Sequence, residues 1–133
     1  MIYLAVFAAL FGAADLRIAT EASCIGMAGP AMIEGGGLGS WEPQDIGPVS
    51  VHRENGVVDI VVADEAEATE VVKRVLACVQ GSVVDWQAAD QSELAALMPT
   101  NRRYAFDVRK VIRHLFDQES FIETQPDMGR AIV

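Results

Sequence analysis

Apolar side chains recur at helical spacing through residues 64–79, and this pattern predicts the best-defined helix of the chain. The apolar positions are Ala68, Val71, Val72, Val75, Leu76 and Val79. They fall on one side of a helix with about 3.6 residues per turn. Asp64 stands in the N-cap position with Glu67 three residues later, which is the spacing of a capping box. Gly81 stands where a C′ glycine ends a helix, so we expect caps at both ends.

The same spacing predicts a second helix at residues 107–116, with Asp107 as its N-cap. Its apolar positions are Val108, Val111, Ile112, Leu115 and Phe116, and its opposite side carries Arg109, Lys110 and Arg113. Residues 80–101, between the two helices, are polar and rich in turn formers. They contain a weak helical pattern at 91–98, which Pro99 ends.

Short apolar runs predict strands before, between and after these helices. The runs of strand length are residues 16–20, 24–27, 49–52, 57–63 and 121–124, and another begins at Arg130. The third and fourth runs are joined by residues 53–56, which end in Asn55-Gly56. An Asn-Gly pair supplies the positive φ angles of a tight turn, so we expect a β-hairpin there. Up to residue 81, strand-like and helix-like segments therefore alternate.

A glycine-rich segment is the first candidate for chemistry. Gly29-Pro30 predicts the start of a short helix, since proline is tolerated in the first turn, and Gly35, Gly36 and Gly37 end it. Backbone N–H groups at such a helix start or loop can hold an anion such as a phosphate. The run is neither G-x-G-x-x-G nor a P-loop with its Lys-Ser/Thr pair. An ordinary helix start and a flexible loop therefore remain open beside anion binding.

The apolar run from Ile2 to Ala14 is shorter than the roughly 20 residues that span a bilayer. It also lacks the basic region of a signal peptide, and no A-x-A cleavage site follows it. We expect a core segment that is buried on both sides, with a membrane or export role as the alternative.

Composition narrows the class of protein. The chain has 133 residues, of which 51% are hydrophobic and 22% are charged, values that are typical of a globular domain. Its 19 acidic and 10 basic residues give a net charge of −9. This charge disfavours a surface that binds nucleic acid or anionic lipid.

The cysteines and histidines do not form a metal-binding pattern. Cys24 and Cys78 lie far apart without C-x-x-C spacing, and His52 and His114 are the only histidines. Neither a disulfide framework nor a metal site is therefore predicted. We expect both thiols to be small buried groups in a reducing, cytoplasmic compartment.

Several polar and aromatic residues have both a structural and a functional interpretation. Glu34 is a general base if it is buried, and otherwise a hydrogen-bonded loop carboxylate. His52 is expected at the end of a strand, as a polar residue without a catalytic role. His114 lies in the last turn of its helix, where the dipole favours a cation. Trp41 and Trp86 are either interface anchors or core residues.

Two stretches of the chain resemble one family. The first is Ile25–Gly39, IGMAGPAMIEGGGLG, followed by PQDIGP at 43–48 and NGVVD at 55–59. The second is Pro99–Ile112, PTNRRYAFDVRKVI, followed by FIE at 121–123 and Gly129-Arg130. In order and spacing, both are similar to the carboxyltransferase (β-type) component of biotin-dependent acyl-CoA carboxylases, the acetyl- and propionyl-CoA carboxylase family.

The resemblance implies an α/β fold of the crotonase-like (ClpP/crotonase) type, in which ββα units stack into a superhelix. This chain would contain only part of that fold. Residues 1–81 would be the C-terminal part of the N-terminal carboxyltransferase subdomain. Residues 82–104 would be a connector, and residues 105–133 would be the start of the C-terminal subdomain.

The resemblance also implies an activity. Family members transfer a carboxyl group from carboxybiotin to the α-carbon of an acyl-CoA, and a backbone oxyanion hole holds the enolate. Biotin is carried on a partner, not bound covalently to this chain, and the coenzyme A thioester is the substrate. The implied partners are biotin carboxylase, a biotin carrier protein or domain, and further copies of the chain in a homo-oligomer. Nucleic acid, membrane and metal are not implied.

Two groups of site residues follow from the resemblance. Val6 and Phe7, or Ala5 and Val6 under the other pairing, align with the backbone oxyanion position. The family carries a Gly-Asn or Gly-Gly pair there, and valine crowds this position. The substrate-binding positions are Gly29, Pro30, Ala31, Glu34, Gly35, Gly36 and Gly37.

Four of the ten basic residues form the one basic cluster of the sequence, Arg102, Arg103, Arg109 and Lys110. It is either a solvated helix face or a surface that attracts CoA phosphates, the carboxylated carrier or a neighbouring subunit.

Two alternative functions remain open. A biotin-dependent acyl-CoA decarboxylase subunit would carry the same motifs, and a truncated, non-catalytic module would only pack against partner subunits. We expect the isolated chain to be inactive, because part of a site cannot position both reactants.

Overall fold

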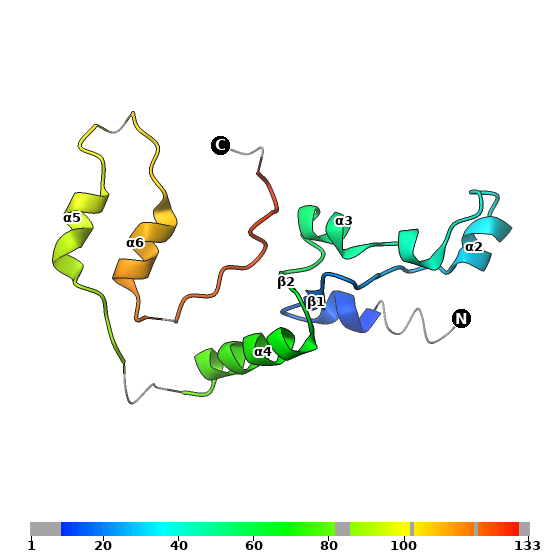
Figure 1. Ribbon diagram of the computed structural model, residues 1–133, viewed down its shortest axis with the longest axis horizontal. Helices are drawn as coiled ribbons and strands as arrows, with labels where there is room; N and C mark the ends of the chain where they lie inside the picture. The colour runs from blue at the N-terminus through cyan, green and yellow to red at the C-terminus, as the bar shows by residue number, and fades with distance from the viewer. Residues whose placement is uncertain (1–8, 82–85, 102, 119, 131–133) are drawn as a thin grey trace. The chain divides into compact units, whose positions relative to one another are not determined.

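The computed structural model describes residues 9–81, 86–101, 103–118 and 120–130 (Figure 1). The chain divides into two compact units, residues 1–72 with 123–133, and residues 73–122. The helix α4, Glu65–Val79, contributes residues to both units. The subdomain borders that the sequence predicts at residues 81 and 104 stay predictions.

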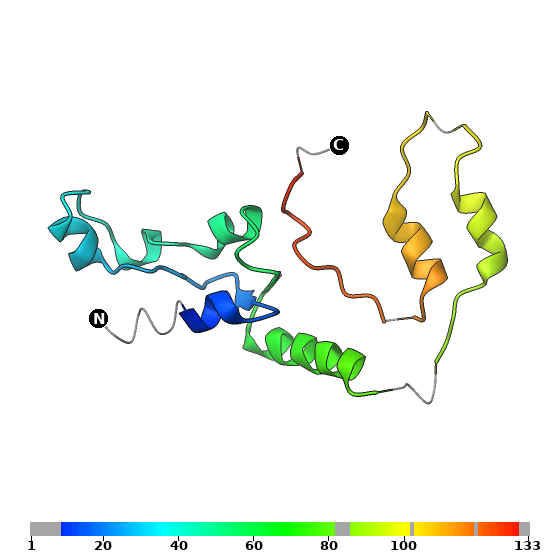
Figure 2. The same ribbon diagram turned by 180° about the vertical axis from the view of Figure 1, so that it is seen from behind.

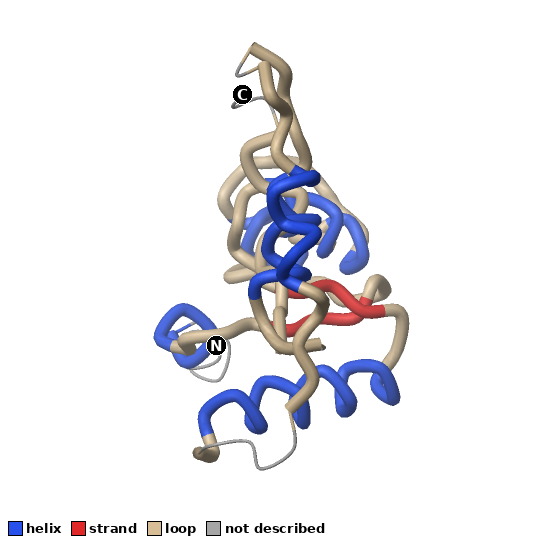
Figure 3. The backbone as a smooth tube through the Cα atoms, turned by 90° about the vertical axis from the view of Figure 1, so that its left-hand side faces the viewer, coloured by secondary structure: helices blue, strands red, loops and turns tan. Residues whose placement is uncertain are grey.

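A parallel pair of strands organises the first unit. The strand β1, Ile18–Thr20, pairs with β2, Ile60–Val62, and Ala19 lies opposite Val61 (Figure 3). A parallel pair requires a crossover connection. Here the connection carries the helix α2, Pro30–Gly35, the 3-10 helix η1, Pro43–Asp45, and the helix α3, Val49–Glu54. The predicted strands at 16–20 and 57–63 are thus confirmed over Ile18–Thr20 and Ile60–Val62.

The core of the first unit is small and lies beside this strand pair. Its buried apolar residues are Ala19, Val49, Val58 and Val62, with exposed fractions between 1% and 8%. Phe11, Ile25 and Val61 are partly buried and pack against this cluster. Residues from β1, β2 and α3 therefore meet in one apolar centre.

The predicted hairpin at residues 49–63 is wrong. Residues 49–52 belong to the helix α3, which begins after Pro48 and buries Val49 while Val51 is 53% exposed. A short apolar run has the same pattern in a buried strand and in one helical turn, so periodicity could not separate them. Asn55 ends the helix, and its side chain accepts a hydrogen bond from the Val57 N–H at 3.0 Å.

Two further strand predictions are also wrong. Residues 24–27 form only an isolated bridge, between Cys24 and Pro48, and residues 121–124 are not in a strand. Arg130 lies in a turn, and residues 131–133 lie outside the described residues.

The apolar run from Ile2 to Ala14 is predicted to be buried on both sides, and the structure differs from this prediction from residue 9 onward. Residues 9–13 are helical, and Leu10 is 67% exposed while Phe11 packs against the core. A segment buried on both sides is therefore wrong for this part, and residues 1–8 lie outside the described residues. Within the described ranges, no helix combines the length and apolar character that a membrane crossing requires.

The capped helix α4 confirms the strongest sequence pattern. The Asp64 carboxylate accepts a hydrogen bond from the Glu67 N–H at 2.9 Å, and Glu67 in turn accepts one from the Ala63 N–H at 2.7 Å. Gly81 has a φ angle of +122°, which suits a glycine after a helix end.

The second unit contains the C-terminal half of α4 and a helical pair. The 3-10 helix η2, Gln91–Glu93, runs into α5, Leu94–Leu97, and both contact α6, Val108–Leu115. Figures 1 and 2 show α5 and α6 side by side. Asp107 caps α6 by accepting a hydrogen bond from the Arg109 N–H at 3.0 Å, as its sequence predicts.

Candidate functional site

The predicted substrate-binding residues form one short helix with glycine at both ends. The helix α2 starts after Gly29, whose carbonyl accepts hydrogen bonds from the N–H groups of Met32 at 3.0 Å and Ile33 at 3.2 Å. Pro30 occupies the first position, as the sequence predicts. The structure therefore brings together the residues from Gly29 to Gly37 that the resemblance singles out.

A Schellman arrangement ends α2. The Gly37 N–H donates to the Glu34 carbonyl at 2.9 Å, and the Leu38 N–H donates to the Ile33 carbonyl at 3.1 Å. Gly37 has a φ angle of +74°, which favours glycine. The predicted break of the helix at residues 35–37 is thus confirmed.

The backbone of α2 is open to close approach. A Cβ atom built on Gly29, Gly35 or Gly37 meets no atom within 4 Å. Glu34 lies on the same helix and is exposed, so the condition of burial for a general base is not met. This segment presents main chain to its surroundings, which suits the close approach of a ligand. Val6 and Phe7, the predicted oxyanion positions, lie outside the described residues.

The segment that leads into α2 is held by a second stretch of chain. The Ile25 N–H donates to the Gly47 carbonyl at 2.7 Å, and the Val49 N–H donates to the Ser23 carbonyl at 3.0 Å. The Ile25 carbonyl accepts a hydrogen bond from His52 Nε2 at 2.7 Å. His52 therefore lies on the helix α3 and not at a strand end, and the sequence contained no signal for its contact with Ile25.

A cavity of about 780 Å³ lies beside this segment in the first unit. Its wall is formed by β1, by residues 23–27, by His52 and by the first turns of α4. Cys24 lines the cavity, and both Cys24 and Cys78 are exposed free thiols. The prediction of two buried cysteines is therefore wrong, because neither side chain points into the small core.

A buried carboxylate lies at the start of the strand pair. Asp59 is 5% exposed, and both of its oxygens accept hydrogen bonds from Arg17, from the backbone N–H at 2.8 Å and from the guanidinium at 2.9 and 3.3 Å. Gln125 adds a hydrogen bond at 2.6 Å. Burial raises the pKa of Asp59, but the hydrogen bonds and charge of Arg17, with Gln125, outweigh it and lower the pKa below its ordinary value.

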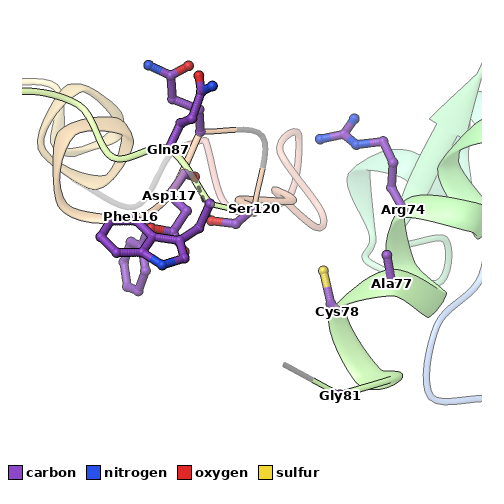
Figure 4. Close-up of a pocket in the computed structure, with 10 residues that line it drawn as sticks. Arg74, Ala77, Cys78, Gly81, Gln87, Phe116, Asp117 and Ser120 are labelled. Carbon is purple, nitrogen blue, oxygen red and sulfur yellow. Dashed lines mark hydrogen bonds between the residues drawn. The ribbon is translucent and has the colours of Figure 1, made fainter. Parts of the chain in front are cut away.

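The second unit contains another cavity of about 780 Å³, between the end of α4 and the segments around α6 (Figure 4). Arg74, Ala77 and Cys78 line one side, and Phe116 and Asp117 line the other. A backbone hydrogen bond from the Gln118 N–H to the Gln87 carbonyl, 2.7 Å long, joins the chain segments of this second side.

The remaining candidates are the two tryptophans and His114. Trp41 and Trp86 are 50% and 65% exposed, so core packing is wrong for both. His114 lies in the last turn of α6, as predicted, and its Nδ1 donates to the Lys110 carbonyl at 2.8 Å.

The basic cluster and the possibility of a metal site remain to be considered. Arg103, Arg109 and Lys110 are exposed, while Arg102 lies outside the described residues, so the role of this basic cluster stays a prediction. Among the residues that the structure describes, no group of three or more His, Cys, Asp and Glu side chains could hold a metal ion.

Comparison with known families gives a match along nearly the whole chain. The sequence model of the carboxyl transferase domain matches residues 5–133. The propionyl-CoA carboxylase beta chain of Rhodococcus erythropolis is 35% identical over 95 residues, which cover 65% of this chain and 20% of that protein. A probable biotin-dependent acyl-coenzyme A carboxylase beta2 subunit of Mycobacterium tuberculosis is 28% identical over 121 residues, 85% of this chain and 23% of that protein. The chain thus spans about a fifth of the length of these relatives.

Solved structures give the same result. A single-chain, multi-domain long-chain acyl-CoA carboxylase aligns with a TM-score of 0.86 and 48% identity, over 92% of this chain and 13% of that chain. The transcarboxylase 12S hexamer, solved with methylmalonyl-coenzyme A and methylmalonic acid, aligns with a TM-score of 0.71 and 20% identity, over 89% of this chain and 25% of that chain. The predicted crotonase-like α/β fold, present in part, is confirmed by these matches.

Proposed function

The chain belongs to the carboxyl transferase domain family, and from this premise we propose that it forms part of an acyl-CoA carboxyltransferase. The observation that carries the proposal is the continuous match over residues 5–133, together with relatives that are named as carboxylase beta chains. We propose that the whole enzyme uses a CoA thioester, biotin on a partner carrier, and a biotin carboxylase. The proposal includes a homo-oligomer and a cytoplasmic location.

In this proposal the α2 segment contacts the acyl-CoA. The positions are Gly29, Pro30, Ala31, Glu34, Gly35, Gly36 and Gly37. Support comes from the open backbone at Gly29, Gly35 and Gly37, where side chains would fill the space in front of the main chain. A chain without these side chains lets a thioester approach the main chain closely.

The proposed reaction removes a proton from the α-carbon of the acyl-CoA and forms a carbon–carbon bond to the incoming carboxyl group. Biotin on the partner carrier would supply that carboxyl group and accept the proton. The part of this chain is to bind and orient the thioester with backbone donors, with Val6 and Phe7 at the proposed oxyanion position. The described side chains of α2 include no buried base, and this fits a reaction in which the protein supplies hydrogen bonds and positioning.

Thermal unfolding with and without propionyl-CoA tests the binding part of this proposal. A ligand that binds only the folded state raises Tm by mass action, so we expect an upward shift with propionyl-CoA and none with free pantetheine. A cooperative transition that propionyl-CoA leaves unchanged at millimolar concentration contradicts substrate binding by this chain.

Complementation tests the catalytic part. The chain is combined with the regions of the Rhodococcus erythropolis beta chain that it does not match, and labelled bicarbonate is followed into the acyl-CoA. We expect labelling only with a biotin carboxylase, ATP and a biotinylated carrier. An assembled complex that binds propionyl-CoA but incorporates no label contradicts the carboxyltransferase.

A second candidate is a non-catalytic module that packs against partner subunits. Large apolar side chains on the described surface favour it, because Met27, Leu38 and Val79 are 79%, 72% and 75% exposed. This candidate predicts a stable complex in the complementation experiment without any labelled product.

A further inference from the structure

His52 is a candidate for a role that neither its sequence context nor the family match assigns. It lies on α3, and its Nε2 is 2.7 Å from the carbonyl oxygen of Ile25, a residue 27 positions earlier in the chain. A carbonyl oxygen can only accept, so Nε2 carries a hydrogen. This hydrogen bond therefore sets the tautomer of the ring.

Neither ring nitrogen is presented for proton transfer in this structure. Nε2 is occupied by the Ile25 carbonyl. Nδ1 is buried, and no group among the described residues forms a hydrogen bond with it. A general acid or base must reach the proton that it transfers, which neither nitrogen does here. The contact with Ile25 is thus the feature that a function of His52 would depend on.

Ile25 is held at both of its backbone polar groups. Its N–H donates to the Gly47 carbonyl at 2.7 Å, and its carbonyl accepts from His52 at 2.7 Å. Gly47 lies so close that a Cβ atom there would be 2.3 Å from the Ile25 oxygen. Residue 25 is consequently a fixed point, four positions before the glycine that starts α2.

We propose that His52 is a positioning residue, whose hydrogen bond to Ile25 sets the path of residues 25–29 into α2 and so aligns the backbone that binds the acyl-CoA. The inference rests on the proposed function of α2 for its consequence in binding, but its structural half is independent of that function. Without His52 the Ile25 carbonyl loses its partner, and the segment before α2 gains freedom.

Three substitutions at one position test this role in the full 133-residue chain. H52L removes the donor, H52Q keeps an N–H at a similar reach, and H52N keeps an amide that is too short. The control is V51A, on the same helix at a position that is 53% exposed. The first measurement is the affinity for propionyl-CoA, and the second is amide hydrogen exchange over residues 25–33 and over α4.

We expect H52L and H52N to weaken propionyl-CoA binding by up to about tenfold, the limit reached if the free energy of the lost hydrogen bond acts entirely on the positioning of α2. H52Q should return the affinity to within about threefold of the parent chain, and V51A should leave it unchanged. Exchange should accelerate at residues 25–33 in H52L and H52N while α4 keeps its protection. A purely structural role would instead lower protection in both regions together.

The remaining outcomes also test whether His52 positions the segment before α2. If folded H52L binds propionyl-CoA like the parent chain, His52 does not position the site. If H52L does not fold, H52Q is compared with H52N instead. Equal affinities of these two variants for propionyl-CoA contradict a positioning role of His52. If the parent chain binds no propionyl-CoA, the proposed function fails. Amide hydrogen exchange at residues 25–33 is then the only test of the structural half. Unchanged exchange rates in both H52L and H52N contradict the positioning of this segment by His52.

Discussion

Arg17 and Asp59 form a two-point ion pair across 42 positions of sequence, with Nε 2.9 Å from Oδ2 and Nη2 3.3 Å from Oδ1. Arg17 lies directly before β1 and Asp59 directly before β2, so the pair links the starts of both strands. The backbone N–H groups of Asp59 and Ile60 also donate to the Arg17 carbonyl, at 2.9 and 3.1 Å. Side chain and main chain therefore hold the strand pair in the same register.

Replacing Asp59 with asparagine should destabilise the chain by about 2–3 kcal/mol. The charged acceptor for Arg17 is lost, and the partly buried guanidinium keeps only the neutral amide oxygen as its partner. Urea unfolding measures this loss, with D45N on the exposed η1 as the control. Equal midpoints for D59N and the parent chain contradict a stabilising role of the pair.

The stability difference between the parent chain and D59N should depend on pH. The pKa of Asp59 is lower in the folded chain than its ordinary value of 3.8, because Arg17 and Gln125 outweigh the opposing effect of burial. A carboxyl group with a lowered pKa stabilises the fold above its ordinary pKa, and this contribution is lost as the pH falls through the folded value. We expect a constant difference from pH 7 to about pH 5 that shrinks below about pH 4. A difference that does not change down to pH 2.5 contradicts the ionised state of Asp59 as its cause.

The side chain of Gln125 should stabilise the fold, although the backbone of this residue has an unfavourable positive φ angle. Its Nε2 donates to Asp59 Oδ1 at 2.6 Å and to the Gly56 carbonyl at 3.1 Å, but its φ angle is +52°. Q125A should lower the unfolding free energy by about 1–3 kcal/mol. Q125G loses the same hydrogen bonds but tolerates the positive φ, so it should be the more stable of the two variants. Thermal unfolding compares them, and a Q125A chain that is more stable than Q125G contradicts strain at this residue.

Two glycines with similar φ angles should respond differently to alanine. Gly47 has a φ angle of +65° and Gly37 has one of +74°. A Cβ at Gly47 would lie 2.3 Å from the Ile25 oxygen, whereas one at Gly37 meets nothing within 4 Å. G37A should therefore cost only the backbone strain of about 1–2 kcal/mol, and G47A clearly more. Chemical unfolding of both variants measures this, and equal losses contradict the close approach of Gly47 to Ile25.

Gly35 allows a test of substrate contact that leaves the fold intact. A Cβ on this last residue of α2 meets no atom within 4 Å, so G35V should change the unfolding free energy by less than about 1 kcal/mol. If the acyl-CoA approaches this backbone, the valine side chain occupies its space and propionyl-CoA affinity should fall at least about tenfold. Isothermal titration measures the affinity, with V51A as a control on a neighbouring helix. Unchanged affinity in folded G35V places the ligand elsewhere.

The sequence by itself determined the elements whose ends depend on neighbouring residues. Asp64 and Glu67 at the start of α4, Asp107 at the start of α6, and Gly37 after α2 each satisfy backbone groups within a few positions. Such hydrogen bonds are encoded locally, and the capping patterns therefore predicted these helices correctly. The collinear motifs around α2 and α6 likewise indicated the family that the comparison confirms.

Tertiary structure decided everything that depends on distant partners. Residues 49–52 form a helix that begins where Pro48 and Val49 meet the segment at Ser23 and Cys24, and an apolar run alone does not reveal that contact. The contact of His52 with Ile25 spans 27 positions, and that of Gln125 with Asp59 spans 66. A periodic pattern reports which side of an element is apolar, but not which segment it meets. Non-local hydrogen bonds therefore set the register of the strands and the support of α2, and only the folded chain shows them.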